Sequence, residues 1–164
     1  SHCCASHPAS EERMNDIRIA AEAMPNPPRE RRRDQYRAAM RPFMAHWLDE
    51  ELGRRRYASS LLVIGELLAD SPTEDHGLLT FYLGEAHRRR NAQGDRTKAA
   101  ELYARAITLP GAPAATWREH GFALRSSGRN AEATAALQRY LELAPQAEDR
   151  AFVQRTLETT GERP

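Results

Sequence analysis

Cysteine is scarce in this chain, and the two cysteines that it has are adjacent. Cys3 and Cys4 stand side by side among 164 residues, so they cannot make the disulfide framework of a small secreted domain. With His2 and His7 they form a group of potential zinc ligands, but adjacent cysteines fit tetrahedral zinc poorly and nothing elsewhere completes a zinc finger. We therefore expect a chain end without a bound metal.

Long apolar runs and a net charge of either sign are also missing. No run reaches the roughly 18 apolar residues of a membrane span, and the net charge is only +1. We therefore expect neither a membrane span nor bulk attraction to nucleic acid. Arginine triplets could suggest a nucleic-acid stripe, but acidic neighbours largely offset the first two, which favours solvated helix ends. The triplets are 31–33, 54–56 and 88–90.

Catalytic motifs are missing as well. The sequence has no His-Glu step, and His46, His76, His87 and His120 lack a second histidine one helical turn later. It has no glycine-rich phosphate loop, and we find no nucleophile–base pair. We therefore expect no enzyme activity and no cofactor in this chain.

What the sequence does have is one pattern written twice between residues 94 and 145. Gly94, Ala99, Tyr103 and Ala106 are answered 34 residues later by Gly128, Ala133, Leu137 and Tyr140. Trp117 and Gly121 precede the second copy, and Pro145 follows it. A 34-residue period with Trp, Gly, Ala, a large apolar residue and Pro in this order resembles the tetratricopeptide repeat.

The resemblance implies an all-α fold, because each repeat is a pair of antiparallel helices that buries its apolar face only against the next pair. Together with helical spacing of apolar residues, it predicts a tetratricopeptide-repeat-like helical superhelix of three pairs with a C-terminal capping helix. The expected pairs are 43–52 with 55–69, 75–91 with 96–109 and 114–127 with 130–143, and the expected cap is 147–159. Three extra residues between Gly84 and Ala99 should lengthen the first helix or the turn of the middle pair.

Prolines mark a boundary ahead of the repeats. One helix is expected from Ser10 to Met24, and the prolines at 25, 27 and 28 then form a stiff linker, because each fixes its own φ and disfavours helix in the residue before it. We therefore divide the chain into an N-terminal segment, 1–28, and a repeat domain, 29–164.

The resemblance also implies a ligand surface, since in tetratricopeptide repeats the first helix of each pair lines the concave side. Arginine beside aromatic residues suits an acidic or C-terminal carboxylate-bearing segment, because guanidinium binds carboxylate in a bidentate way. The alternative interpretation, that these are solvated or packing residues, stays open. By repeat position the groove residues are Phe81, Glu85, Arg88, Arg118, Phe122 and Arg125.

A second resemblance lies near the start of the chain. Ser6-His7-Pro8, followed by Arg13, is similar to a short motif of the CAAX-prenyl-protease-like zinc metallopeptidases, several bacterial members of which continue into tetratricopeptide repeats. In that family the loop histidine, matched here by His7, lies near the active-site opening. The family's zinc belongs to an H-E-x-x-H helix that this chain lacks, so the resemblance implies a tail of such a protein and not the peptidase itself.

Both resemblances together favour a protein- or peptide-binding scaffold module. As the C-terminal repeat region of a periplasmic or envelope zinc metallopeptidase it would hold substrate or partner, or dock on its own peptidase domain. The alternative is a free-standing cytoplasmic adaptor with no peptidase relation. An upstream H-E-x-x-H with a signal peptide would favour the first, and a start codon at Met14 the second.

Overall fold

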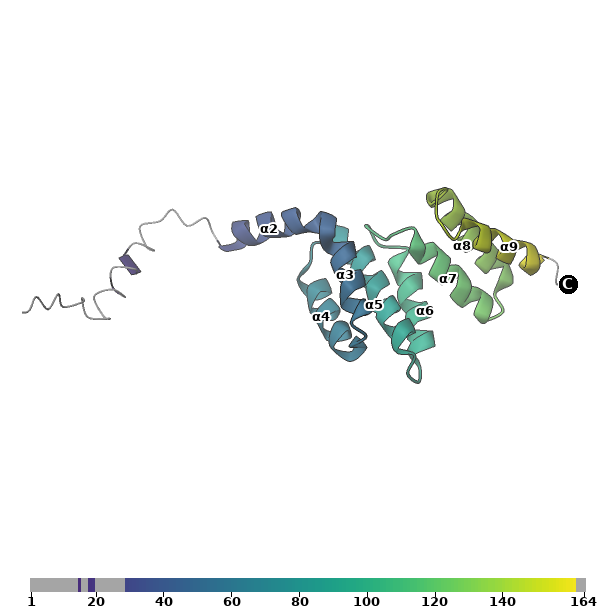
Figure 1. Ribbon diagram of the computed structural model, residues 1–164, viewed down its shortest axis with the longest axis horizontal. Coiled ribbons are helices and arrows are strands. Elements are labelled where there is room, and N and C mark those ends of the chain that lie inside the picture. The colour runs from purple at the N-terminus through teal and green to yellow at the C-terminus, as the bar shows by residue number, and fades with distance from the viewer. Residues whose placement is uncertain (1–14, 16–17, 20–28, 162–164) are drawn as a thin grey trace, which may run out of the picture. The chain divides into compact units, whose positions relative to one another are not determined.

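A computed structural model describes residues 15, 18–19 and 29–161 of the chain (Figure 1). The described residues form helices and turns without a strand, which confirms the expected all-α class. The chain divides into two compact units, Ser1–Met44 and Ala45–Pro164. Most of the helix expected from Ser10 to Met24, and the proline linker after it, lie outside the described residues.

The first unit contributes α2 (Arg29–Met40) and the short 3-10 helix η1 (Arg41–Phe43). Pro42 lies in the first turn of η1, where its missing N–H costs nothing. The α-helix therefore ends before this proline.

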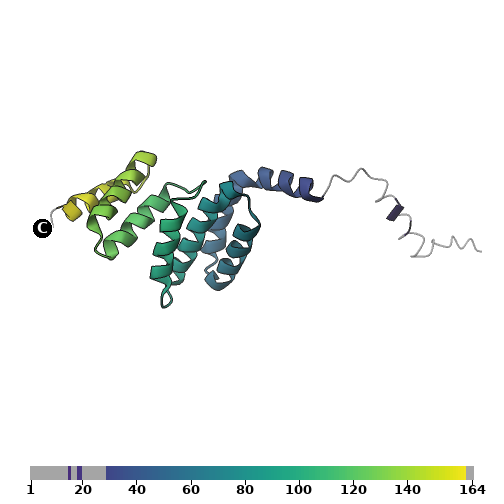
Figure 2. The same cartoon turned by 180° about the vertical axis from the view of Figure 1, so that it is seen from behind.

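The second unit is a row of α-helices in which, from α4 onward, each helix packs on the next (Figures 1 and 2). α4 packs on α5, α5 on α6, α6 on α7, α7 on α8, and α8 on α9. The helices are α3 (Met44–Gly53), α4 (Tyr57–Asp70), α5 (His76–Arg90), α6 (Asp95–Ala106), α7 (Ala115–Ser126), α8 (Asn130–Leu143) and α9 (Arg150–Gly161), with a 3-10 turn η2 (Thr73–Asp75) before α5. In the described part of the chain, no helix has the length and apolarity needed to cross a bilayer.

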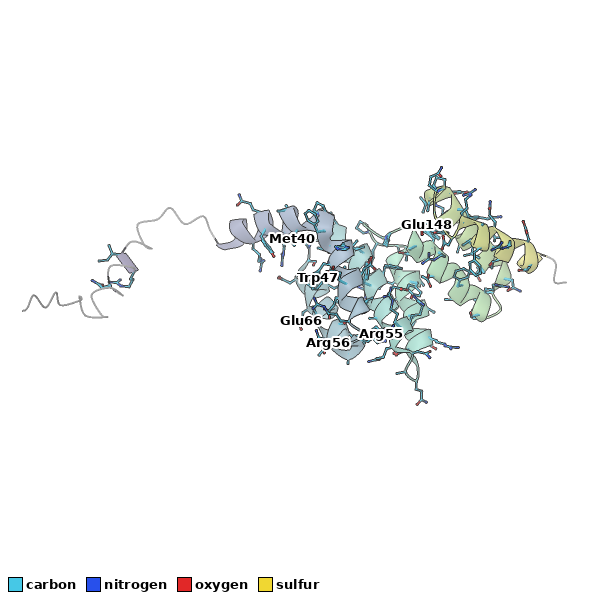
Figure 3. All side chains as sticks on the ribbon, in the orientation of Figure 1. Met40, Trp47, Arg55, Arg56, Glu66 and Glu148 are labelled. Atoms are coloured by element: carbon cyan, nitrogen blue, oxygen red, sulfur yellow. The ribbon has the colours of Figure 1, made fainter. Side chains whose placement is uncertain are left out.

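Side-chain hydrogen bonds attach α3 to the next two helices. The Ser60 hydroxyl donates to Glu51 at 2.9 Å, and the Tyr82 hydroxyl donates to the Ala45 carbonyl at 3.0 Å. The turn between α3 and α4 holds the second arginine triplet, whose members are all exposed (Arg55 and Arg56 are labelled in Figure 3). This exposure agrees with the expected solvated helix end.

The two central hairpins, α5–α6 and α7–α8, repeat one packing contact. A methyl group placed on Gly84 would lie 2.6 Å from the Tyr103 ring, and one placed on Gly121 would lie 2.7 Å from Leu137. Tyr103 and Leu137 are equivalent residues of the sequence pattern. In each hairpin a glycine therefore lets the first helix approach a large side chain of the second.

The extra residues of the middle pair are shared among its parts. Compared with the α7–α8 hairpin, α5 continues further past its packing glycine, the turn at 91–94 is longer than that at 127–129, and α6 starts earlier relative to Ala99. Both turns contain a glycine with positive φ, 82° at Gly94 and 79° at Gly128, a conformation that side chains with a Cβ disfavour. The longer helix and the longer turn, given as alternatives by the sequence, are both present.

Candidate functional site

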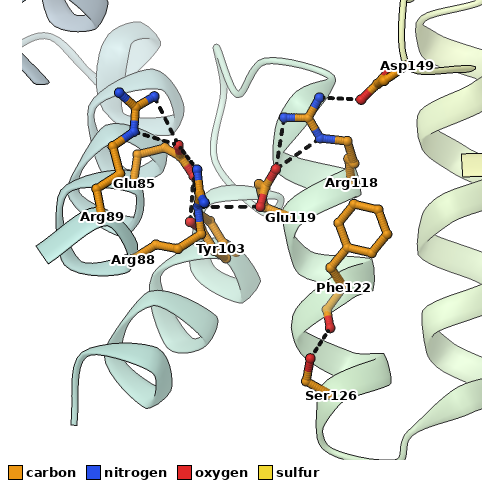
Figure 4. A network of polar contacts seen from close by, with 9 residues as sticks. All are labelled: Glu85, Arg88, Arg89, Tyr103, Arg118, Glu119, Phe122, Ser126 and Asp149. Carbon is orange, nitrogen blue, oxygen red and sulfur yellow. Dashed lines mark hydrogen bonds and ion pairs between the residues drawn. The ribbon is translucent and has the colours of Figure 1, made fainter. Parts of the chain in front are cut away.

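A chain of charged side chains runs from α5 to the segment before α9 (Figure 4). Its first half surrounds Glu85, which is only 4% exposed. Arg88 donates to the two carboxylate oxygens of Glu85 at 2.8 and 2.7 Å, and the Tyr103 hydroxyl donates at 2.7 Å. Arg89 adds a fourth bond at 3.3 Å. This buried carboxylate is therefore fully engaged within the α5–α6 hairpin.

The second half of this polar network connects the two hairpins. Arg88 Nε lies 3.6 Å from a carboxylate oxygen of Glu119 on α7. Glu119 also pairs with Arg118 at 2.8 Å, and Arg118 reaches Asp149 at 2.6 Å. Asp149 in turn accepts a hydrogen bond from the Tyr140 hydroxyl. The same network thus ties α5, α7, α8 and the start of α9 together.

Charges within the network are matched. Burial alone would raise the pKa of Glu85, but the hydrogen bonds from Arg88 and Tyr103 more than offset burial and hold this pKa below its ordinary value. Burial raises the pKa of Tyr103 far above its ordinary value, so the phenol stays neutral and donates. Three arginines, at 88, 89 and 118, therefore face three carboxylates, at 85, 119 and 149.

These contacts bear on the groove residues predicted from repeat position. The structure brings Glu85, Arg88 and Arg118 into one network, where they bind one another or their neighbours. Phe81 is 6% exposed and packs its ring 6.0 Å from that of Tyr103. That these residues bind a ligand stays a prediction, but most of their surface and charge is already used inside the chain.

The two remaining groove residues are more open. Phe122 is half-buried, with its ring 6.0 Å from Phe152. Arg125, also half-buried, forms no ion pair with any residue that the structure describes. Of the predicted arginines it is the one left without a carboxylate. The motif residues His7, Pro8 and Arg13 lie outside the described residues.

A cleft of about 720 Å³ lies between α6 and α7. This volume is in the range of protein sites that hold a ligand, roughly 300–1,000 Å³. Small and apolar side chains make up much of its wall, and of the predicted groove residues only Arg88 and Phe122 belong to it. The apolar lining consists of Ala99, Ala100, Tyr103, Ala104, Phe122, Ala123 and Leu124, and the polar lining of Arg88, Arg96, Thr97, Glu101, Glu119, His120, Ser126, Ser127 and Arg129.

The α6 wall of this cleft was not foreseen from the sequence, because the prediction placed the ligand surface on the first helix of each pair. One signal was available. Ala100 and Ala104 stand four residues apart, on one face of α6, and Ala104 is exposed. A small apolar pair on the outer side of a helix leaves room for another chain to approach.

Two histidines lie near these features. His87 Nδ1 is 2.7 Å from Asp95 Oδ1, and Arg90 and the Ala92 N–H bond the same carboxylate at 2.7 and 2.8 Å. His87 and Asp95 thus fasten the turn between α5 and α6. Burial, and then the charge of Arg129, lower the pKa of His120, which favours the neutral form of this imidazole in the wall of the cleft.

Neither a model of a known protein family nor a curated protein matches this sequence. Within the described ranges, no group of three or more His, Cys, Asp or Glu side chains could hold a metal ion. The site consists of an open cleft beside an ionic network whose members pair with one another.

Proposed function

We propose that this chain is a tetratricopeptide-type scaffold module that binds a segment of another protein. The observation that carries the proposal is the open cleft of about 720 Å³ between two hairpins that repeat the same internal contact. Stacked helix pairs with an exposed surface between them are a form that repeat proteins use for recognition. The 34-residue sequence period supports the same interpretation.

We place the binding site in the cleft between α6 and α7. The arginines at 88 and 118, which the sequence offered as carboxylate ligands, already pair with carboxylates of the chain. A ligand that recruited them would have to break those bonds first, which would leave a buried charge such as Glu85 less well paired. The cleft requires no such exchange.

The role that we propose within a larger protein follows from the motif at the start of the chain. Its likeness to the zinc metallopeptidases supports a non-catalytic C-terminal region that holds a substrate or partner, or docks on the peptidase domain, in the periplasm or envelope. The zinc would belong to that other domain. The gene's upstream sequence tests this: an H-E-x-x-H and a signal peptide support it, whereas a start codon at Met14 leaves the cytoplasmic adaptor.

Binding itself is tested by selection from a displayed library of random peptides of roughly 12 residues, long enough to lie along such a groove. We expect wild-type protein to enrich peptides whose binding falls by at least about tenfold in Ala104→Trp, because the indole fills the cleft. Ala135→Trp is the matched control, since Ala135 is exposed on α8 and does not line the cleft.

Arg125→Glu completes the set and tests the α7 surface predicted from the sequence. If peptides are lost with Arg125→Glu and kept with Ala104→Trp, the scaffold proposal stands but its site is the predicted groove. Failure to enrich any peptide above background with folded wild-type protein would overturn the proposed function.

A further inference from the structure

We infer that the cleft between α6 and α7 takes an amphipathic helical segment of a partner protein, with a carboxylate of that segment placed opposite Arg96. This inference rests on the proposed function and names the chemistry of its ligand.

The walls of the cleft favour a helix as the occupant. Its two sides are themselves helices, and the facing positions Ala100, Ala104 and Ala123 carry the smallest apolar side chain. Small residues let a third backbone approach to the distance of about 8–10 Å at which helices pack. Phe122 lies among them and, being only half-buried, offers apolar surface to a larger side chain of the incoming segment, above the buried Tyr103 and Leu124. An apolar groove of this kind is the setting in which amphipathic helices dock through residues spaced three and four apart.

The charged side chains that line the cleft indicate which charge the partner segment carries beside its apolar face. Five charged side chains line the cleft, and four have an opposite charge inside the chain. Glu101 pairs with Lys98 at 3.1 Å, and Arg129 bonds Glu132 at 2.7 Å. Arg88 and Glu119 belong to the polar network.

Arg96 is the exception. It is exposed, and among the residues that the structure describes its guanidinium bonds only the side-chain oxygen of Asn91, at 3.3 Å. It lies in the first turn of α6, where the helix dipole adds positive potential. Within the described part of the chain, the cleft therefore has one unmatched cation at the N-terminal end of α6, and a carboxylate on the partner matches it in a charge-assisted hydrogen bond.

Two displayed pools of helix-forming peptides of roughly 16 residues, about four turns, test the inference with the full chain. Both pools carry randomised apolar residues at positions three and four apart. One pool has Glu at the end of the apolar stripe and the other has Gln there. We expect wild-type protein to enrich the Glu pool over the Gln pool by about two- to fivefold, the preference that an ion pair with an exposed arginine supplies.

Arg96→Glu should abolish this preference, and Arg105→Glu should keep it. Arg105 is exposed on the same helix and does not line the cleft, so it controls for the change in net charge. Circular dichroism checks that both variants keep their helix content.

The outcomes separate this inference from the proposed function. Equal enrichment of the Glu and Gln pools, or a preference that survives Arg96→Glu, overturns the inference. The proposed function still stands in that case if peptides from the random library bind wild type and lose binding in Ala104→Trp. Random binders of extended, non-helical sequence overturn it too. A dimer that Ala104→Trp converts to a monomer, measured by light scattering, would instead assign the cleft to a second copy of the chain and overturn it.

Discussion

At the scale of single residues, Tyr103 combines two roles that sequence patterns treat separately. Its ring fills the space opposite Gly84, and its hydroxyl donates to the buried Glu85 at 2.7 Å. The equivalent position in the next hairpin, Leu137, keeps the packing role without the hydroxyl. The polar network is therefore anchored to the repeat's own packing contact, and only in the α5–α6 hairpin.

Glycine-to-alanine substitutions should separate packing from intrinsic helix preference. Gly84→Ala places a methyl 2.6 Å from the Tyr103 ring, and we expect it to lower the free energy of unfolding by about 1–3 kcal/mol through overpacking. Gly65 lies inside α4 with no atom within 4 Å of such a methyl, so Gly65→Ala should raise it by roughly 0.5–1 kcal/mol. Urea unfolding measures both. A Gly84→Ala protein at least as stable as wild type would contradict the repeated close contact.

At the scale of elements, the α5–α6 turn depends on one ionised side chain. Arg90 first and His87 second hold the pKa of Asp95 below its ordinary value of 3.8. A lowered pKa means that the folded state binds the proton less readily than the unfolded state. The stability that Asp95 contributes is therefore complete above about pH 4 and is lost as the pH falls from there through the folded-state pKa.

Asp95→Asn should therefore reduce the loss of unfolding free energy that wild type shows as the pH falls below about 4. The variant should be less stable than wild type at pH 7, because the amide cannot pair with Arg90, and the difference should shrink as the pH falls from about 5 to about 2. Urea midpoints across this range measure the effect. Glu158→Gln, at an exposed position on α9, is the control and should keep the wild-type slope. A constant gap between Asp95→Asn and wild type would refute the assignment.

The helices could be predicted from the sequence because the residues that bound a helix and the period of its apolar residues agree. α8 was expected at 130–143 and spans Asn130–Leu143, since Gly128 and Pro145 bound an apolar period that lies between them.

The candidate site could be predicted only in part, because side-chain contacts between two helices do not follow from the sequence of either helix alone. Arg88 and Glu119 lie on different hairpins, so no local sequence pattern predicts their ion pair. Whether an arginine offers its charge to a ligand depends on such partners, and this is why Arg88 and Arg118 looked free in the sequence. The cleft could not be predicted for the same reason, since its two walls come from helices of different pairs.

At the scale of the whole molecule, the two ends of the chain should differ in what they contribute to stability. Among the residues whose burial is described, the apolar core runs from Leu48 to Val153 and lies in the unit Ala45–Pro164. At its C-terminal end, Val153 on α9 is fully buried in a cluster with Leu137 and Tyr140, while its neighbour Phe152 is 55% exposed. α9 thus covers the last hairpin through one face.

Two truncations should therefore have unequal effects. A protein of residues 45–164 lacks α2 and η1 but should keep the helices from α3 to α9, melt within about 2 °C of the full chain and select the same peptides, because it retains the core and both walls of the cleft. A protein that ends at residue 144 loses Val153 and Asp149, which exposes Leu137 and Tyr140 and leaves Arg118 short of one carboxylate. It should lose more than about 2 kcal/mol of unfolding free energy and tend to self-associate through the uncovered face. Thermal unfolding followed by circular dichroism, with light scattering for association, measures both proteins. Equal losses of unfolding free energy from the two truncations would mean that stability is not concentrated in the stacked unit. A stack whose members support only their neighbours must weaken most where its buried end is removed.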